Sequence, residues 1–229
     1  MAVRELGYAL TAFSAAMGVL AYFVLGLRPL AYSMIGIAVV GLTAIAVGGE
    51  PRPSRTSLRS MVEALAVNAE ALLEEVEAYG RAIFMPPRDG LVIAFVPERD
   101  PADPASLASS LESAPLRLMG AVAGVRGVAL LLPEPELRSR DVEDSVRKAV
   151  VEDLELAEAV RVRVSGDVVT VEAVRPRARA LPRFDSSLSP LPTAVAASVI
   201  AKAVGRPVRL ERAYSTPDGV GAEFRILGT

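Results

Sequence analysis

The residues that most suggest catalysis are Ser198 and Lys202, which lie one turn apart in a predicted helix. A hydroxyl and an amine at this spacing resemble a serine hydrolase site, a chemistry that needs a buried, deprotonated lysine. Val195, Val199 and Ala203 predict the apolar side of the same helix, so the pair falls on a solvated face. We therefore expect a structural role for this helix.

Metal and cofactor chemistry finds little support in the composition. The chain has no Cys and no His, which excludes disulfides, zinc–thiolate sites, iron–sulfur clusters, histidine-ligated haem and imidazole bases. Four acids of one predicted helix are dispersed around its axis and predict a charged surface: Glu152, Asp153, Glu155 and Glu158. No glycine-rich phosphate-binding motif occurs. We predict a protein that is not an enzyme and has no cofactor, metal ion or small-molecule ligand.

A short arginine-rich segment is the clearest charge feature. Nine consecutive residues contain four arginines and no acid, and these arginines are Arg175, Arg177, Arg179 and Arg183. Such a segment can contact anionic lipid headgroups, an acidic protein surface or a nucleic-acid backbone. It lacks aromatic side chains for base stacking, so lipid and protein are favoured over nucleic acid. Because Arg outnumbers Lys 23 to 2 in the whole chain, a solvated linker is the alternative.

The elements that would position these residues begin with a strongly apolar N-terminus. Hydrophobic residues make up 52% of the 229-residue chain, and the mean hydropathy is +0.38. Uncharged runs of 22 and 21 residues occupy 6–27 and 29–49, with Arg28 between them. Each run is long enough to cross about 30 Å of hydrocarbon, so residues 1–49 are predicted to form a transmembrane helical hairpin. A cleaved signal peptide is the alternative for the first run, which is longer than an ordinary signal-peptide core.

Charge predicts the orientation of this hairpin. Arg4 precedes the first run and three arginines follow the second, and positive charge near a membrane favours the cytoplasmic side. Both termini and the remaining 180 residues, which carry a net charge of −3, are therefore expected in the cytoplasm. Small residues recur four positions apart and permit close helix packing, at Ala12/Ala16, Ser14/Gly18 and Ala44/Gly48. Neither run contains an acid, a base or an amide, so the hairpin is predicted to be an anchor.

A long amphipathic helix is predicted at 50–80, directly after the hairpin. Its apolar residues step by four and three positions and form a heptad seam of three repeats: Leu58, Val62, Leu65, Ala69, Leu72, Val76 and Tyr79. Gly80 is expected to end the helix. The seam either packs on its own domain or forms a coiled coil between subunits. The candidate interaction residues are therefore the four arginines together with Leu58, Val62, Leu65, Leu72 and Val76.

Residues 81–229 are predicted to form one soluble α+β domain. Strand and helix signals alternate along it, with β runs at 91–96, 127–132, 160–164, 168–174, 208–214 and 220–227, and helices at 106–111, 139–157 and 189–204. A helix followed by a hairpin occurs twice. We expect a mainly antiparallel sheet covered by helices on one face.

Three segments carry a resemblance to known proteins: GRAIFMPPRDG, ALLLPEPEL and SPLPTAVAASVIAKAVGRPVRLE. They resemble stretches of a family of uncharacterised archaeal membrane proteins that combine two N-terminal spans with a soluble α+β domain. The resemblance implies an archaeal source and the same layout, and it carries no activity or site with it. Scarce Lys beside abundant Arg, and the absence of Cys, also fit a thermophile.

These observations favour a membrane-anchored, non-enzymatic scaffold or accessory subunit of a membrane complex. Its partners would be membrane lipid and either another protein or a second copy of the chain. The alternative is a membrane-tethered ligand sensor, or an enzyme that uses converging arginines and carboxylates without His or Cys. A deep pocket in which such groups converge would favour the alternative, and a flat surface would favour the scaffold.

Overall fold

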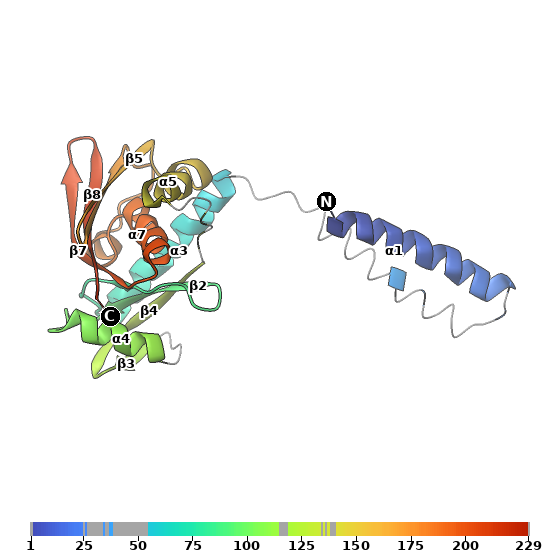
Figure 1. Ribbon diagram of the computed structural model, residues 1–229, viewed down its shortest axis with the longest axis horizontal. Helices are drawn as coiled ribbons and strands as arrows, with labels where there is room; N and C mark the ends of the chain where they lie inside the picture. Colours follow the sequence, from blue (N-terminus) through green and yellow to red (C-terminus); the bar gives the residue numbers. More distant parts are fainter. Residues whose placement is uncertain are drawn as a thin grey trace. The chain divides into compact units, whose positions relative to one another are not determined.

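The chain divides into two compact units, Met1–Pro53 and Ser54–Thr229 (Figure 1). This computed structural model describes most of the chain: residues 2–24, 26, 34, 37–38, 55–114, 119–133, 135, 137 and 141–228. In the first unit, α1 spans Ala2–Val19 and continues into η1, a short π-helix at Leu20–Val24. The predicted first membrane run is therefore helical over most of its length.

The two-span hairpin is not confirmed. Its turn at Arg28 and Pro29, and most of the second run, lie outside the described residues. Among the helices that the structure describes, one stretch, Pro182–Val204, is long and apolar enough to cross a membrane, and 72% of its apolar window is buried inside the second unit. That burial is typical of a core helix. Tyr8–Phe23 is an apolar helix of shorter length.

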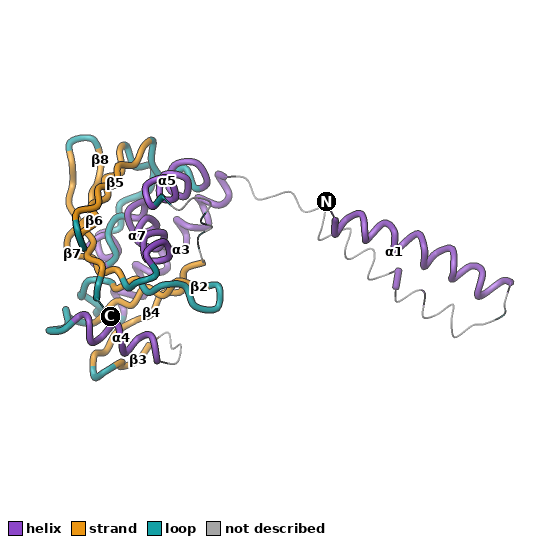
Figure 2. Tube along the Cα trace, viewed as in Figure 1, coloured by secondary structure: helices purple, strands orange, loops and turns teal. Residues whose placement is uncertain are grey.

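The second unit is built on an eight-stranded antiparallel sheet, which confirms the α+β class (Figures 1 and 2). The strand order is β3-β4-β2-β1-β7-β8-β6-β5. In chain order the strands span Ile83–Phe84, Leu91–Pro97, Met119–Val122, Val125–Pro133, Ala159–Ser165, Val168–Val174, Val208–Thr216 and Gly219–Ile226. The two-residue strand β1 pairs with both β2 and β7, so it joins two halves made of hairpins.

Most of the helices cover one face of this sheet. They are α3 (Arg55–Glu75), α5 (Val142–Arg147) with its continuation η2 (Lys148–Asp153), α6 (Pro182–Ser187) and α7 (Leu191–Val204). α7 packs on strands from both halves of the sheet and is also contacted by α5 and η2. Its apolar residues are therefore buried on nearly all sides, and they form the centre of the main core.

The expectation of helices on only one face is wrong, because α4 (Pro104–Ser113) packs on the opposite one. Leu107, Ala108 and Leu111 of α4 form a second core with Phe95 of β2. Alternate residues of β2 point to opposite faces, so Ala94 enters the main core while Phe95 enters the second. The uninterrupted apolar sequence of β2 follows from this two-sided burial.

The structure also corrects the expected end of the long helix. α3 ends at Glu75, and Glu77 adopts a left-handed conformation with φ of 52°. The N–H of Ala78 donates to the carbonyl of Leu73 at 3.1 Å, and the N–H of Glu77 donates to that of Glu74 at 3.2 Å, which is a Schellman motif. Gly80 instead permits close packing, since a Cβ there would lie 2.5 Å from Cγ of Pro97.

Candidate functional site

In the described part of α1 and η1 most large apolar side chains are exposed, and the two buried side chains are small. Six large side chains are between 43% and 77% exposed: Tyr8, Phe13, Val19, Leu20, Tyr22 and Phe23. Ser14 and Ala21, in contrast, are 2% and 0% exposed. A Cβ at Gly18 would lie 3.4 Å from Cβ of Met34, so the small side is the packed one. A surface helix of a soluble protein buries its large apolar side chains and exposes polar ones. Small residues at helix–helix contacts are instead typical of helices in lipid.

The pairs of small residues differ in their surroundings. Ser14 and Gly18 lie on the packed side of α1, and the Ser14 hydroxyl donates to the carbonyl of Thr11 at 3.0 Å. Ala12 and Ala16 are exposed. Ala44/Gly48 lies outside the described residues. Of the two pairs that the structure describes, Ser14/Gly18 is therefore the one on the packed side of α1.

α3 packs on its own domain, with its buried stripe rotated away from the predicted seam. Ala66, Ala69 and Leu73 are buried in the main core, and Val62, Leu72 and Val76 pack against its edge. Of these, Ala66 and Leu73 were not predicted to lie on the seam. The heptad pattern placed the preceding residues, Leu65 and Leu72, there instead. Alanine at the contact allows the helix axis to approach the sheet closely.

This rotation leaves an apolar strip on α3, which we name the α3 flank, formed by Leu58, Met61, Leu65 and Leu72. Met61 and Leu65 are 62% and 53% exposed, and Leu58 and Leu72 are half-buried. Their spacing of three, four and seven residues places them on one side of the helix. Val67 is also exposed, but it lies two residues from Leu65 and so projects elsewhere. The α3 flank is therefore an exposed apolar strip on the described surface of the second unit.

The arginine-rich segment is divided between two places. Nη1 of Arg177 lies 3.9 Å from the Glu155 carboxylate, and Nη1 of Arg175 lies 3.1 Å from that of Glu158. Arg179 is exposed and makes no ion pair with any residue that the structure describes. Arg183 belongs instead to the packing of the domain, with its guanidinium carbon 3.9 Å from the centre of the Tyr79 ring.

Glu70 explains the position of Arg183. Its carboxylate accepts hydrogen bonds from the backbone N–H groups of Arg183, at 3.0 Å, and Phe184. These N–H groups are at the N-terminus of α6, where a helix has no internal acceptors for them. Burial, together with the charge of Glu70, raises the pKa of the neighbouring Asp185. Glu70 was not recognised from the sequence, because its partners are more than 110 residues away.

The face of β7, β8 and β6 opposite the main core carries a lattice of ion pairs, which we name the open sheet face. Arg209 contacts Asp100 at 3.2 Å and Glu211 at 3.7 Å. Arg225 contacts the same Glu211 at 3.1 Å. Arg212 makes a two-pronged contact with Glu223, at 2.8 and 2.6 Å. Arginines and carboxylates therefore converge here, but on a sheet surface and in mutual pairs.

The pKa shifts on the open sheet face follow from its ion pairs and from partial burial. Burial opposes ionisation of Asp100, but the backbone N–H of Arg81 and the guanidinium groups of Arg81 and Arg209 bring its pKa below the usual value. The hydrogen bond from Arg212 lowers the pKa of Glu223. Burial and nearby carboxylates raise the pKa of Tyr214. These shifts hold the acids ionised and the phenol neutral at pH 7, so none of the three groups is tuned for proton transfer there.

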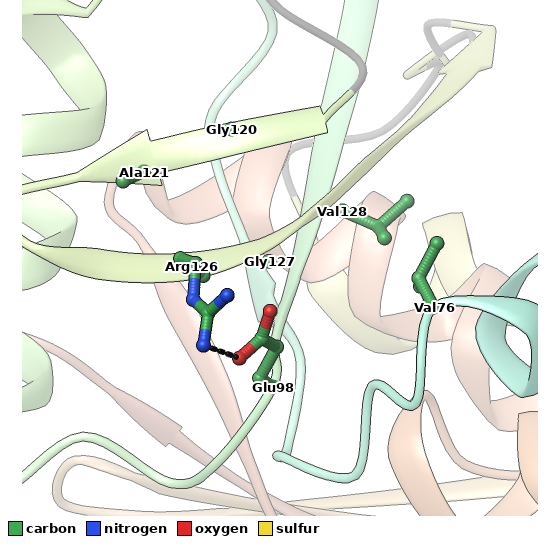
Figure 3. A pocket seen from close by; sticks show the side chains of 7 residues that line it. All are labelled: Val76, Glu98, Gly120, Ala121, Arg126, Gly127 and Val128. Atoms are coloured by element: carbon green, nitrogen blue, oxygen red, sulfur yellow. Dashed lines mark ion pairs between the residues drawn. The ribbon is translucent and has the colours of Figure 1, made fainter.

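Two small pockets lie on the described surface. One has a volume of about 200 Å³ and contains the pair Arg126–Glu98, whose charged atoms lie 3.3 Å apart and point toward each other (Figure 3). The other, of about 350 Å³, lies between α4 and β3, and its lining has one hydroxyl, that of Ser110, and no charged residue. Pockets for small ligands typically have about 300–1,000 Å³ and a few convergent polar groups. Neither of the two combines these properties.

The sequence expectation for Ser198 is wrong in one respect, because its side chain is buried in the core. Its hydroxyl lies 3.4 Å from the carbonyl of Ala194, and Nζ of Lys202 donates to the carbonyl of Pro135 at 2.7 Å. Neither hydrogen bond joins the serine to the lysine. The described residues also contain no group of three or more potential metal ligands. The acids of η2 pair with basic residues instead, as Asp153 does with Lys148 at 2.8 Å.

Comparison of the chain with protein-family models, with curated proteins and with solved structures gives no match. The inference of function therefore depends on three surfaces described above. These are the outward apolar side of α1, the α3 flank and the charged segment around Arg175 and Arg177.

Proposed function

We propose that this protein is a membrane-anchored, non-enzymatic scaffold or accessory subunit of a membrane complex. The hairpin at 1–49 would hold the chain in the membrane with both termini in the cytoplasm. The second unit would dock a partner protein or a second copy of the chain. The observation that carries the proposal is the surface of α1, where large apolar side chains face outward and Ser14, Gly18 and Ala21 face inward.

Physical chemistry favours lipid as the environment of that surface. Exposing large apolar side chains to water costs roughly 1.5–3 kcal/mol for each fully exposed one, and the six on this helix are about half exposed or more. Contact of the same side chains with lipid hydrocarbon has no such cost, and helices in hydrocarbon associate through small residues. Arg52, Arg55 and Arg59 follow the second apolar run and favour the orientation with the second unit in the cytoplasm.

The surface of the second unit supports docking over catalysis. The arginines and carboxylates of the open sheet face neutralise each other in pairs and line neither of the two pockets described above. The α3 flank, in contrast, offers Met61 and Leu65 to an apolar partner. An amphipathic helix with apolar residues at three- and four-residue spacing is the partner that such a strip fits.

The anchor is tested by washing native membranes with alkaline carbonate and floating them on a density gradient. The protein should stay with the lipid fraction, and a C-terminal reporter should be inaccessible to protease added to intact cells. Release of the chain into the wash would contradict the anchor. Cleavage of the reporter from outside would contradict the orientation while leaving the anchor intact.

Docking is tested by crosslinking in native membranes, followed by separation in a mild detergent. We expect a species larger than the 24.1 kDa chain, and we expect Met61→Glu with Leu65→Glu to reduce it strongly. Val67→Glu is the matched control, because it places a charge at an exposed apolar position off the α3 flank. A chain that remains a monomer in its native membrane, or equal loss in the control, would contradict docking through this strip.

A further inference from the structure

The fold brings one end of α3 next to the arginine-rich segment, although 120 residues separate them in sequence. Glu155 lies between the two and contacts Arg55 of α3 at 3.7 Å and Arg177 at 3.9 Å. The neighbouring pair Arg175–Glu158 lies on the same segment. Arg55, Arg175, Arg177 and Arg179 thus form one surface feature, which we name the basic cluster.

The backbone of this segment is held in place. The N–H of Arg175 donates to the carbonyl of Asp218 at 2.8 Å, and the N–H of Arg177 donates to that of Leu156 at 2.8 Å. Ala178 packs against the main core. The backbone of the segment is therefore fixed on the domain, and the guanidinium groups of its arginines are exposed to solvent.

The basic cluster has charge to spare for a ligand. Its four arginines face two ion-paired carboxylates, Glu155 and Glu158, and Asp218 lies beside Arg175 along the backbone, which leaves a local net charge of +1. The side chains of Arg55, Arg175 and Arg177 are 62%, 73% and 46% exposed. Exposed ion pairs contribute little to stability, so these guanidinium groups can exchange a carboxylate for another anion. A guanidinium binds phosphate oxygens with two parallel hydrogen bonds, which makes phosphate a suitable ligand.

The sequence places the basic cluster close to the predicted membrane surface. Five residues, 50–54, separate Arg55 from the end of the second apolar run, and an extended chain advances at most about 3.6 Å per residue. Arg55 is therefore within roughly 22 Å of the point where the chain leaves the hydrocarbon. The remaining arginines of the cluster follow it through the Glu155 contact.

The charges of α3 support the same assignment. A helix is stabilised by acids near its N-terminus and by bases near its C-terminus. α3 has the reverse order, with Arg55 and Arg59 in its first turns, no acid in its first turn, and Glu74 and Glu75 at its end. This order of charges does not stabilise the helix dipole. It would, however, favour an interaction between the N-terminal end of α3 and an anionic surface beside it.

We propose that the basic cluster binds the phosphate headgroups of anionic lipids and so docks the second unit onto the bilayer surface. The inference rests on the proposed anchor, which delivers the cluster to the membrane. Docking in turn would fix the orientation of α3 and of its apolar flank relative to the bilayer. The attraction would act only within about a Debye length, near 8–10 Å at ordinary ionic strength, and would weaken as salt is added.

The test uses the full chain in vesicles, and the absence of cysteine makes single labelling straightforward. Ala180→Cys carries a fluorophore next to the basic cluster, and Ser165→Cys carries it at the far end of β5 as a reference. Quenching by a water-soluble quencher is compared in vesicles of neutral lipid and in vesicles that also contain anionic lipid. We expect protection of the label at 180 in anionic vesicles only, and its loss in high salt.

Variants assign the effect to the named arginines. Arg177→Glu with Arg179→Glu should abolish the protection, since each removed arginine weakens the attraction by about fivefold even before the new charges repel the lipid. Arg177→Lys with Arg179→Lys should retain most of it. Arg88→Glu with Arg126→Glu, two exposed arginines in the β2–β4 half of the sheet, gives the same change of charge away from the cluster and should retain it as well.

Failure of this inference is distinguishable from failure of the anchor. If the chain floats with both kinds of vesicle but the label at 180 is quenched equally in both, the anchor stands and headgroup binding is overturned. Equal loss of protection in the Arg88/Arg126 control would also overturn it, because a general charge effect would explain the result. If the chain does not float with either vesicle, the anchor itself fails.

Discussion

Glu70 and Arg183 are joined by a hydrogen bond of 3.0 Å from the backbone N–H of Arg183 to the Glu70 carboxylate, across 113 residues of sequence. The same carboxylate accepts from Phe184, so the middle of α3 caps the N-terminus of α6. The contact places the end of the arginine-rich segment beside α3. It also accounts for the different fates of Arg183, which is packed on Tyr79, and Arg177, which faces solvent.

Removing this cap should destabilise the second unit. We expect Glu70→Ala to lower the free energy of unfolding by about 1–2 kcal/mol, the usual cost of losing a helix cap. Glu74→Ala is the control, because Glu74 is exposed on the same helix and should change stability by less than about 0.5 kcal/mol. Urea unfolding of the full chain in detergent, followed by circular dichroism, measures both. Equal stability of the two variants would contradict the capping role.

The packing of α3 predicts unequal effects for two leucines of this helix, Leu73 and Leu65. Leu73 is fully buried in the main core, so Leu73→Ala should cost about 2–5 kcal/mol. Leu65 is largely exposed in one copy of the chain, so Leu65→Ala should cost less than about 1 kcal/mol in a detergent that separates subunits. The same unfolding measurement distinguishes them. The reverse order would show that the predicted heptad seam, rather than the observed stripe, faces the core.

Asp100 predicts a specific dependence of stability on pH. Its folded pKa lies below the unfolded value, because Arg81 and Arg209 outweigh the effect of burial. The stability that it contributes is therefore present above the unfolded pKa, near 4, and is lost as the pH falls through the lower folded value. Asp100→Asn should reduce stability at pH 7 and show a smaller further loss between pH 5 and about pH 2. An identical acid dependence in wild type and variant would exclude this contribution.

Local sequence signals predicted the elements whose ends are chemically marked. The strand β2, the β5–β6 and β7–β8 hairpins and the helix α7 all agree with expectation to within a few residues. α7 ends as predicted at Gly205, whose left-handed φ of 63° favours glycine. In each case an apolar run is bounded by Gly, Pro or a turn, so the short-range pattern is sufficient.

The elements that the sequence did not reveal depend on long-range partners. β1 consists of only Ile83 and Phe84 and exists because β2 and β7 pair on either side of it. α6 depends on Glu70 for its cap, and the burial of α3 depends on how closely Ala66 and Ala69 approach the core. No local pattern encodes such contacts.

The candidate surfaces were likewise predicted only as far as local sequence patterns reach, because their long-range contacts are not encoded locally. The arginine-rich segment was visible as a charge pattern, but its meeting with Arg55 through Glu155 requires the folded chain. The heptad identified α3 as amphipathic and misplaced its buried stripe by part of a turn. The second membrane run lies outside the described residues and stays a prediction.

The central claim is that α1 lies in lipid, and the accessibility of single spin labels tests it most directly. Labels at Phe13→Cys and Ser14→Cys probe the outward and the packed side of the helix in the full chain, reconstituted in vesicles. Collisions with dissolved oxygen, which concentrates in hydrocarbon, should be frequent at 13 and rare at 14. Collisions with a water-soluble nickel complex should be rare at both positions. Frequent collisions of the nickel complex with the label at 13 would contradict the membrane anchor and the scaffold built on it.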